Sequence, residues 1–216
     1  MIKSGSFITF EGGEGAGKTT LINRLAASLT NQGKKVITTR EPGGTSEAES
    51  IRRLLVQRDA GEWSPLSEVL LLYAARSLHI DRVIQPALDN GHIVISDRFT
   101  DSTVAYQGYG RGMSLEKIQE IDQVVTGGLK PDVTFILDVD VKIGLERSQK
   151  RLSVEKGYSS TEDRFERMDI SFHESLRAGF LEIAKSEPER CHVINAEEPL
   201  DDMFNTIQNI VKKHYV

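Results

Sequence analysis

The sequence contains little cysteine and no excess of positive charge. Its 216 residues include one cysteine, and 27 lysines and arginines stand against 32 aspartates and glutamates, which gives a formal net charge of −5. One cysteine cannot form an internal disulfide, so we expect no need for an oxidising compartment. Cys191 lies in an apolar run and is expected to be a core residue, with a catalytic thiol as the alternative. Without a basic excess to neutralise phosphates, the composition predicts no nucleic-acid partner and no binding to membrane surfaces.

Long hydrophobic runs and linkers are also absent from the sequence. No apolar run approaches the roughly 18 residues that a membrane-spanning helix requires. Residues 1–5 lead into an apolar strand and a glycine loop rather than a signal peptide. We therefore expect a cytoplasmic protein without a membrane partner. Since no boundary rich in proline, glycine and serine divides the chain, we expect a single domain over residues 1–216.

Short apolar or β-branched runs alternate with longer helical patterns along the chain. This order predicts an α/β fold in which helices flank a five-stranded parallel sheet. The expected strands cover residues 7–10, 36–39, 93–96, 133–137 and 192–194. The expected helices cover residues 18–31, 46–56, 67–89, 115–126, 141–150, 166–186 and 200–213. Pro86 should bend or end the third of these helices, because proline lacks a backbone N–H group.

A polar segment at residues 151–164 interrupts this alternation. It contains glycine, serines and charges of both signs. A solvated surface loop is the ordinary interpretation of such a segment. The charges that flank it favour the alternative of a mobile lid.

Residues 12–19 fit the phosphate-binding pattern G-x-x-x-x-G-K-[ST] without a gap. They follow an expected strand and open an amphipathic helix, which is the context that a P-loop requires. Backbone N–H groups and the helix N-terminus would bind phosphates here, Lys18 would reach the outer phosphates, and the Thr19 hydroxyl could ligate Mg²⁺. We therefore predict a P-loop NTPase fold. The predicted ATP-binding residues are Gly12, Gly13, Glu14, Gly15, Ala16, Gly17, Lys18 and Thr19.

Two further absences narrow the class of P-loop protein. The chain has no N-K-x-D segment of the kind that reads guanine in regulatory GTPases, and it is small for a motor protein. A small phosphotransferase remains, whose acceptor site must lie outside the P-loop. Residues 39–45 (TREPGGT) and 97–108 (DRFTDSTVAYQG) each follow an expected strand. Open α/β sheets bind ligands at the carboxyl ends of their strands, so both segments are acceptor-site candidates.

The segments FEGGEGAGKTT, TREPGGT and DRFTDSTVAYQG together resemble the thymidylate kinase family of nucleoside monophosphate kinases. The resemblance covers essentially the whole chain. It implies transfer of the γ-phosphoryl group of MgATP to dTMP to give dTDP, a step of dTTP biosynthesis. It also implies Mg²⁺ as cofactor, ATP and dTMP as small-molecule partners, and a homodimer that could use the helices at 67–89 and 115–126.

The resemblance implies phosphate and metal contacts for three residues. Asp97 would hold Mg²⁺, Arg98 would bridge the donor and acceptor phosphates, and Arg52 would contact the acceptor phosphate. From the residues alone, Asp97 could instead cap the following helix and Arg98 could form a surface ion pair. Arg52 could likewise be one half of a solvated pair with Arg53.

The same resemblance implies contacts with the deoxyribose and with the bend beneath its phosphate. Glu14 matches a carboxylate that holds the 3′-hydroxyl and helps to position Mg²⁺. Glu41 and Pro42 match a bend whose peptide bond tends to be cis in the family. Tyr106 matches a residue that crowds the 2′ position and rejects ribonucleotides, and a plain core tyrosine is the alternative.

Selection of the base would fall to Arg76, Thr103 and Gln107 as hydrogen-bonding groups, with Leu72 and Tyr73 as the apolar wall. Many relatives have an aromatic residue at the position of Leu72 that stacks on thymine, so this chain departs from the pattern. Either Leu72 or Tyr73 could supply the contact, and burial in the core is the alternative for this stretch.

The P-loop contains no second basic residue, which resembles the branch of the family in which the lid supplies arginines. The candidates are Arg147, Arg151 and Arg164, of which we favour the last two because they bracket the polar segment. Glu166 matches an acidic position near Mg²⁺ and the sugar. The predicted catalytic residues are Glu14, Lys18, Arg98, Arg151 and Arg164.

Two other functions stay open from the residues. A different nucleoside or nucleotide kinase, such as a deoxynucleoside kinase, would phosphorylate a hydroxyl and would use Glu14 or Glu41 as a general base. A non-catalytic ATP-binding switch would instead hydrolyse ATP slowly without an acceptor.

Overall fold

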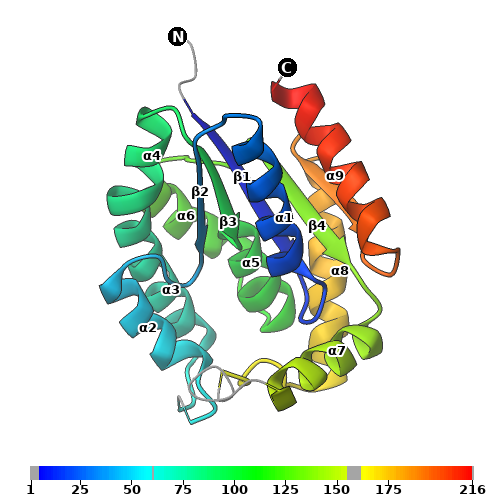
Figure 1. The fold of residues 1–216 in the computed structure, drawn as a ribbon. Helices are drawn as coiled ribbons and strands as arrows, with labels where there is room; N and C mark the ends of the chain where they lie inside the picture. Colours follow the sequence, from blue (N-terminus) through cyan, green and yellow to red (C-terminus); the bar gives the residue numbers. More distant parts are fainter. Residues whose placement is uncertain (1–4, 60, 155–161, 216) are drawn as a thin grey trace.

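A parallel sheet forms the centre of the molecule. The computed structural model describes residues 5–59, 61–154 and 162–215. Within them five strands lie in the order β2-β3-β1-β4-β5 (Figure 1). They are β1 (Ser6–Gly12), β2 (Val36–Arg40), β3 (Ile93–Asp97), β4 (Val133–Asp138) and β5 (Cys191–Asn195). The predicted α/β fold with a five-stranded parallel sheet is confirmed.

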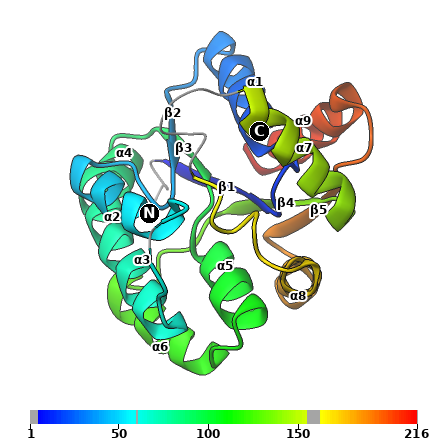
Figure 2. The same cartoon turned by 90° about the horizontal axis from the view of Figure 1, so that it is seen from below.

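Helices cover both faces of this sheet. The α-helices are α1 (Lys18–Asn31), α2 (Ser46–Val56), α3 (Pro65–His79), α4 (Gln85–Asp89), α5 (Thr100–Thr103), α6 (Leu115–Thr126), α7 (Val141–Val154), α8 (Ile170–Ser186) and α9 (Leu200–Tyr215). Two π-helical segments, η1 (Ile80–Ile84) and η2 (Val104–Gly110), follow α3 and α5. Figure 2 shows α1 and α9 on one side of the sheet, with α3, α5, α6 and α8 on the other.

The strand β1 contributes to two separate cores because its side chains alternate between the faces. Ile8 and Phe10 pack with Leu21 of α1 and with α9, whereas Phe7 packs with Ile84 and Phe99 on the opposite face. Since both faces are covered, the sequence reads as short apolar runs. Among the helices described, none combines the length and the apolar character that crossing a membrane requires.

The helix predicted at residues 67–89 is divided into three parts. It begins two residues earlier, with Pro65 in the first turn and the side chain of Ser64 as its N-cap. The π-helical segment η1 then separates α3 from α4, just before Pro86. Pro86 cannot donate a backbone hydrogen bond, so the regular ladder cannot continue through it. The interruption expected at this proline is confirmed.

Three larger differences from the sequence-based expectation remain. The expected helices did not include residues 97–108, where α5 and η2 form. The helix predicted at 166–186 begins at Ile170, after a turn. The predicted lid at 151–164 starts inside α7, which extends to Val154; the part of it at residues 155–161 lies outside the described residues.

Candidate active site

The P-loop joins β1 to α1 at the carboxyl edge of the sheet. Gly15 has a φ of 68°, and a Cβ placed on it would lie 2.0 Å from the carbonyl oxygen of Gly144. Only glycine satisfies both conditions. Gly17, with a φ of 91°, precedes α1 and turns the backbone into the helix. The chain therefore presents the backbone N–H groups of the loop and the N-terminus of α1 to one place, as phosphate binding requires.

Lys18 lies across this loop. Its side chain is buried, and Nζ donates hydrogen bonds to the carbonyl oxygens of Gly12 at 3.1 Å and Gly13 at 2.9 Å. Burial lowers the pKa of Lys18, and the charge of Arg98 lowers it further, while Glu14 raises it. The ammonium group is thus fixed at the loop with a neighbouring cation and a carboxylate.

Thr19 and Asp97 bring the P-loop and the end of β3 together. The Thr19 hydroxyl donates to the Asp97 carboxylate at 3.2 Å. A hydroxyl and a carboxylate side by side are hard oxygen ligands of the kind that Mg²⁺ prefers. Within the described residues no group of three or more His, Cys, Asp and Glu side chains could hold a metal. Mg²⁺ is usually bound by one or two protein groups together with water and substrate phosphates, so the Thr19–Asp97 pair could hold it.

Arg98 follows directly after β3 and points into the cleft. Its guanidinium donates to the carbonyl oxygen of Gly12 at 3.0 Å, to Ser102 at 3.1 Å and to Glu14 at 3.0 Å. Burial opposes its charge, but Tyr106, Glu14 and Asp97 together raise the pKa of Arg98 above its ordinary value. The alternative of an exposed ion pair does not hold, since only 15% of the side chain is exposed.

Glu14 is an anionic group beside these cations and forms an ion pair with Arg98. Burial alone would raise its pKa, but the charges of Arg98 and Lys18 and a hydrogen bond from Tyr106 lower the pKa of Glu14 to about 2. The Tyr106 hydroxyl donates to Glu14 at 2.5 Å, and the Arg98 guanidinium lies 4.9 Å from the centre of the tyrosine ring. Tyr106 therefore lines the cleft, with one edge against the core. The Glu14 carboxylate therefore stays ionised at neutral pH.

The bend after β2 contains a cis peptide bond between Glu41 and Pro42, as the resemblance implied. Glu41 is buried and accepts a hydrogen bond from Arg76 Nε at 2.7 Å, and its other oxygen lies 2.8 Å from His79 Nδ1. Arg52 donates to the carbonyl oxygen of Pro42 at 3.1 Å. Glu41 is thus occupied by two partners, while Pro42 and Arg52 lie at the wall of the cleft.

The base-selecting candidates Arg76, Thr103 and Gln107 lie together on α3, α5 and η2. Arg76 Nη2 donates to Thr103 Oγ1 at 3.1 Å, and Gln107 Nε2 donates to Glu68 at 2.9 Å. Their remaining polar atoms, Arg76 Nη1 and Gln107 Oε1, are buried and have no hydrogen-bond partner among the described residues. A buried donor and a buried acceptor without partners are costly unless a ligand satisfies them.

These groups line one cleft of about 730 Å³, a volume in the range of small-molecule sites. The predicted site residues that line it are Glu14, Gly15, Ala16, Gly17, Lys18, Thr19, Glu41, Pro42, Arg52, Leu72, Arg76, Asp97, Arg98, Thr103, Tyr106, Gln107, Arg151 and Glu166. Burial, followed by the charge of Glu14, raises the pKa of Glu166 to about 7. The cleft thus joins the P-loop to the segments after β2 and β3.

Two predicted side chains point away from the cleft. Tyr73 packs in the core with Val69 and Ile118, and its hydroxyl donates to Asp122 at 3.0 Å. Leu72 lines the cleft, whereas Tyr73 is buried and is not among the lining residues. The placement of Tyr73 in the apolar wall is therefore wrong.

Arg164 is the second predicted side chain that points away from the cleft. It donates to Glu68 at 2.5 Å and to the carbonyl oxygen of Leu55, so it holds the C-terminal end of the segment at 151–164 against α2 and α3. Of the candidate arginines on α7, both Arg147 and Arg151 line the cleft. The preference for Arg164 over Arg147 is corrected accordingly.

Sequence reasoning did not single out Ser102, Glu162 and Phe165, which also line the cleft. Ser102 lies within the motif at 97–108, in α5, where it accepts a hydrogen bond from Arg98. Glu162 and Phe165 follow residues 155–161, and no local pattern distinguishes them from a solvated loop.

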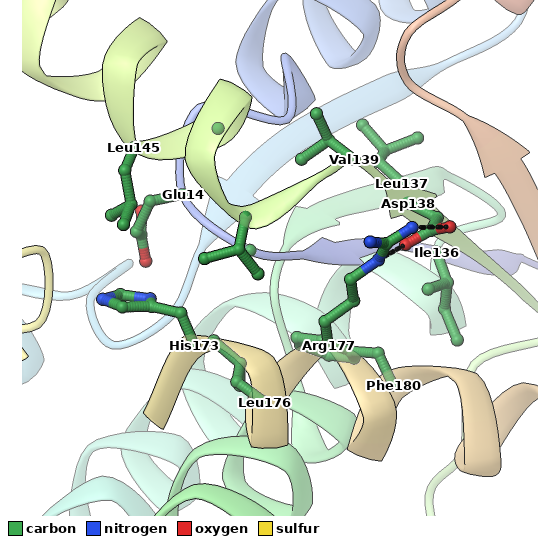
Figure 3. A pocket seen from close by; sticks show the side chains of 13 residues that line it. Glu14, Ile136, Leu137, Asp138, Val139, Leu145, His173, Leu176, Arg177 and Phe180 are labelled. Atoms are coloured by element: carbon green, nitrogen blue, oxygen red, sulfur yellow. Dashed lines mark hydrogen bonds and ion pairs between the residues drawn. The ribbon is translucent and has the colours of Figure 1, made fainter. Parts of the chain in front are cut away.

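A second, smaller cavity lies behind Glu14, between β4, α7 and α8 (Figure 3). Leu145, His173 and Leu176 line it, and the Arg177–Asp138 ion pair lies at its side. Its volume of about 30 Å³ suits one or two water molecules. It is too small for a nucleotide.

The parallel sheet, the P-loop at its carboxyl edge and the adjoining cation-lined cleft define a P-loop nucleotide-binding phosphotransferase. Residues 10–207 match the sequence family described as thymidylate kinase. The chain is 50% identical to a thymidylate kinase of Caulobacter vibrioides over 96% of both chains, and 45% identical to one of Magnetococcus marinus over 98% of this chain and 97% of the other. A crystal structure of thymidylate kinase from Ehrlichia chaffeensis superposes with a TM-score of 0.76 at 37% identity, covering 96% of this chain and 98% of that one. The chain belongs to the thymidylate kinase family.

Proposed function

We propose that the chain transfers the γ-phosphoryl group of MgATP to dTMP, giving ADP and dTDP for dTTP biosynthesis. The P-loop with Lys18 binds ATP, and the cleft beyond Arg98 binds dTMP. Membership of the thymidylate kinase family supports the reaction, and the lining of the cleft supports the assignment of each side chain.

The observation that carries the proposal is the pair of buried, unpartnered atoms on Arg76 and Gln107. Thymine presents a carbonyl oxygen beside an N–H group on its edge, so it can accept from Arg76 Nη1 and donate to Gln107 Oε1. A site built for such a pair rejects bases that leave either atom unsatisfied. Leu72 lines the same region and would contact the ring by dispersion.

The acceptor in this proposal is a phosphate oxygen, which is largely ionised at neutral pH. No general base is then required, and the obstacle is repulsion between two anions. Lys18, Arg98 and Arg52 supply the positive charge that offsets it, with Arg147 or Arg151 completing the set. A hydroxyl acceptor fits less well, because Glu14 has a pKa of about 2 and Glu41 is bound by Arg76 and His79.

Thr19 and Asp97 would hold Mg²⁺, and Glu14 and Glu166 also line the cleft. When bound, the ion neutralises charge on the donor phosphates. The residues themselves orient the nucleotides, and the Glu14 carboxylate, already bonded to Tyr106, would accept from the sugar 3′-hydroxyl. Tyr106 would crowd the 2′ position.

We also propose a homodimer that acts in the cytoplasm. Leu66 and Leu70 of α3 and Val124 of α6 are exposed, and α3 and α6 pack together, so these helices offer one apolar surface. Sedimentation at micromolar concentration tests this state, and a monomer would contradict it.

A coupled assay of ADP formation tests the proposed reaction. When dTMP, dUMP and thymidine are supplied separately as rival acceptors, the rate of ADP formation should be highest with dTMP. Preference for thymidine would indicate a nucleoside kinase instead. Slow ATP hydrolysis that no acceptor stimulates would indicate a nucleotide switch.

A further inference from the structure

The backbone of Arg98 is held in an unfavourable conformation. Its φ of 73° lies in the left-handed region, and among the described residues Arg98 alone combines a positive φ with a side chain. Such a conformation persists only where the surroundings impose it, and it clusters at functional sites. The groups that impose it here are therefore part of what places the guanidinium.

Two hydrogen bonds hold the backbone of Arg98. Its N–H donates to the carbonyl oxygen of Phe10 at 3.0 Å, and its own carbonyl oxygen accepts from the Ser96 hydroxyl at 2.8 Å. The first bond fixes the peptide before the strained residue, and the second holds the carbonyl side of the peptide after it. Neither bond reaches the N–H side of that following peptide or the side chain of Arg98.

Glu11 of β1 reaches both of those places. Its Oε1 accepts the N–H of Phe99 at 2.7 Å, and its Oε2 accepts the hydroxyl of Ser102 at 2.5 Å. The Ser102 oxygen in turn accepts a hydrogen bond from Arg98 Nη1 at 3.1 Å. One carboxyl group thus binds the peptide after the strained residue and the hydroxyl that contacts its guanidinium.

The cost of Glu11 indicates that these contacts matter. The side chain of Glu11 is completely buried on the face of β1 that α5 covers. Phe7 lies four residues earlier on the same face and packs in an apolar core. Burial, together with the charge of Asp101, raises the pKa of Glu11 to about 8. An apolar side chain would fill the same space without that penalty, but it would leave the Phe99 N–H without an acceptor.

We infer that Glu11 is a positioning residue for phosphoryl transfer, which fixes Phe99 and Ser102 and thereby holds the Arg98 guanidinium where the donor and acceptor phosphates meet. The inference rests on the proposed function. Arg98 contacts the phosphates, and Glu11 acts through it.

Two substitutions of Glu11 separate positioning from packing. E11D keeps a buried carboxylate but withdraws it by one methylene, so it cannot hold both donors; kcat should fall about tenfold to a hundredfold, as expected for a catalytic group displaced by about 1 Å. E11Q keeps the length of the side chain. Its amide oxygen can accept from the Phe99 N–H and its amide nitrogen can donate to the Ser102 oxygen, so kcat should stay within about threefold of that of the unsubstituted enzyme. KM for ATP should stay unchanged in both, because the P-loop binds ATP.

A double-mutant cycle with R98A tests whether Glu11 acts through Arg98. Single-turnover rates with excess enzyme and radiolabelled ATP detect the residual transfer in R98A. E11D should lower the rate in the unsubstituted enzyme and have little further effect in R98A. D132A is the matched control, since the Asp132 carboxylate accepts the N–H of Phe7 at the other end of β1. It should lower thermal stability without changing kcat.

The outcomes are distinct. If E11D lowers the rate equally with and without Arg98, or if E11Q loses as much activity as E11D, the inference is wrong. An unsubstituted enzyme that forms no ADP with dTMP would instead contradict the proposed function.

Discussion

Arg52 and Glu162 form an ion pair at the wall of the cleft, although they lie 110 residues apart in the sequence. Arg52 Nη2 is 2.8 Å from Glu162 Oε2, and Nε is 3.2 Å from the same oxygen. Both side chains are about four-fifths buried. Arg52 is the arginine proposed to contact the acceptor phosphate, so the carboxylate of Glu162 lies where it competes with that phosphate.

E162Q should therefore lower KM for dTMP, roughly threefold to tenfold, which corresponds to about 1 kcal/mol. The amide can still accept one hydrogen bond from Arg52 but no longer neutralises it. Steady-state kinetics with dTMP varied at saturating ATP measures the change. D163N is the control, because Asp163 binds Arg58 outside the cleft, and it should leave KM for dTMP unaltered. A higher KM in E162Q would show that Glu162 positions Arg52 rather than competing for it.

R98A should reduce turnover by about a thousandfold or more, since Arg98 is proposed to neutralise both phosphates at the point of transfer. Circular dichroism should show that the fold survives. R177A removes an arginine that binds Asp138 beside the smaller cavity and should keep most of the activity. Turnover of R98A close to that of the unsubstituted enzyme would contradict the proposed role of Arg98 in phosphoryl transfer.

Y106A should relax discrimination against ribonucleotides, because the ring would no longer crowd the 2′ position. The ratio of kcat/KM for dTMP to that for ribothymidine monophosphate measures the effect and should fall at least about tenfold. Y106F retains the ring and should retain most of the discrimination, although it loses the hydrogen bond to Glu14. An unchanged ratio in Y106A would refute the steric role.

E11Q should change how stability depends on pH. The pKa of Glu11 is raised to about 8 in the folded protein, against an ordinary value of 4.5, mainly by burial. Between these values the folded state retains a proton that the unfolded state has released, so stability falls as pH rises through this range. Glutamine does not titrate, and urea denaturation should show the stability of E11Q gaining on that of the unsubstituted protein from pH 5 to pH 8. Parallel profiles would contradict the raised pKa.

The strands and the P-loop could be predicted from the sequence because their signals are local. Apolar runs define β1, β3 and β4, and the spacing of glycines with Lys18 and Thr19 defines the loop. Because ligands bind at the carboxyl ends of parallel strands, Asp97 and Arg98 could also be predicted to lie beside the P-loop. The hydrogen bond between Thr19 and Asp97 agrees with this prediction.

The remaining features depend on contacts between distant segments. Arg164 faces Glu68, a buried residue 96 positions away that also accepts from Arg111 and Gln107, and nothing near Arg164 in the sequence indicates that partner. Tyr73 and Leu72 are both apolar and adjacent, so periodicity alone could not determine which of them faces the cleft. The role proposed for Glu11 could not be predicted for the same reason, because the Phe99 N–H and the Ser102 hydroxyl that donate to it lie 88 and 91 residues further along the chain.

A crystal structure with dTMP and a non-hydrolysable ATP analogue tests the central claim most directly. The account predicts that the thymine edge contacts Arg76 Nη1 and Gln107 Oε1, and that the dTMP phosphate lies against Arg98, facing the triphosphate in the P-loop. Thymine bound away from that pair of atoms, or a phosphate that does not contact Arg98, would contradict it.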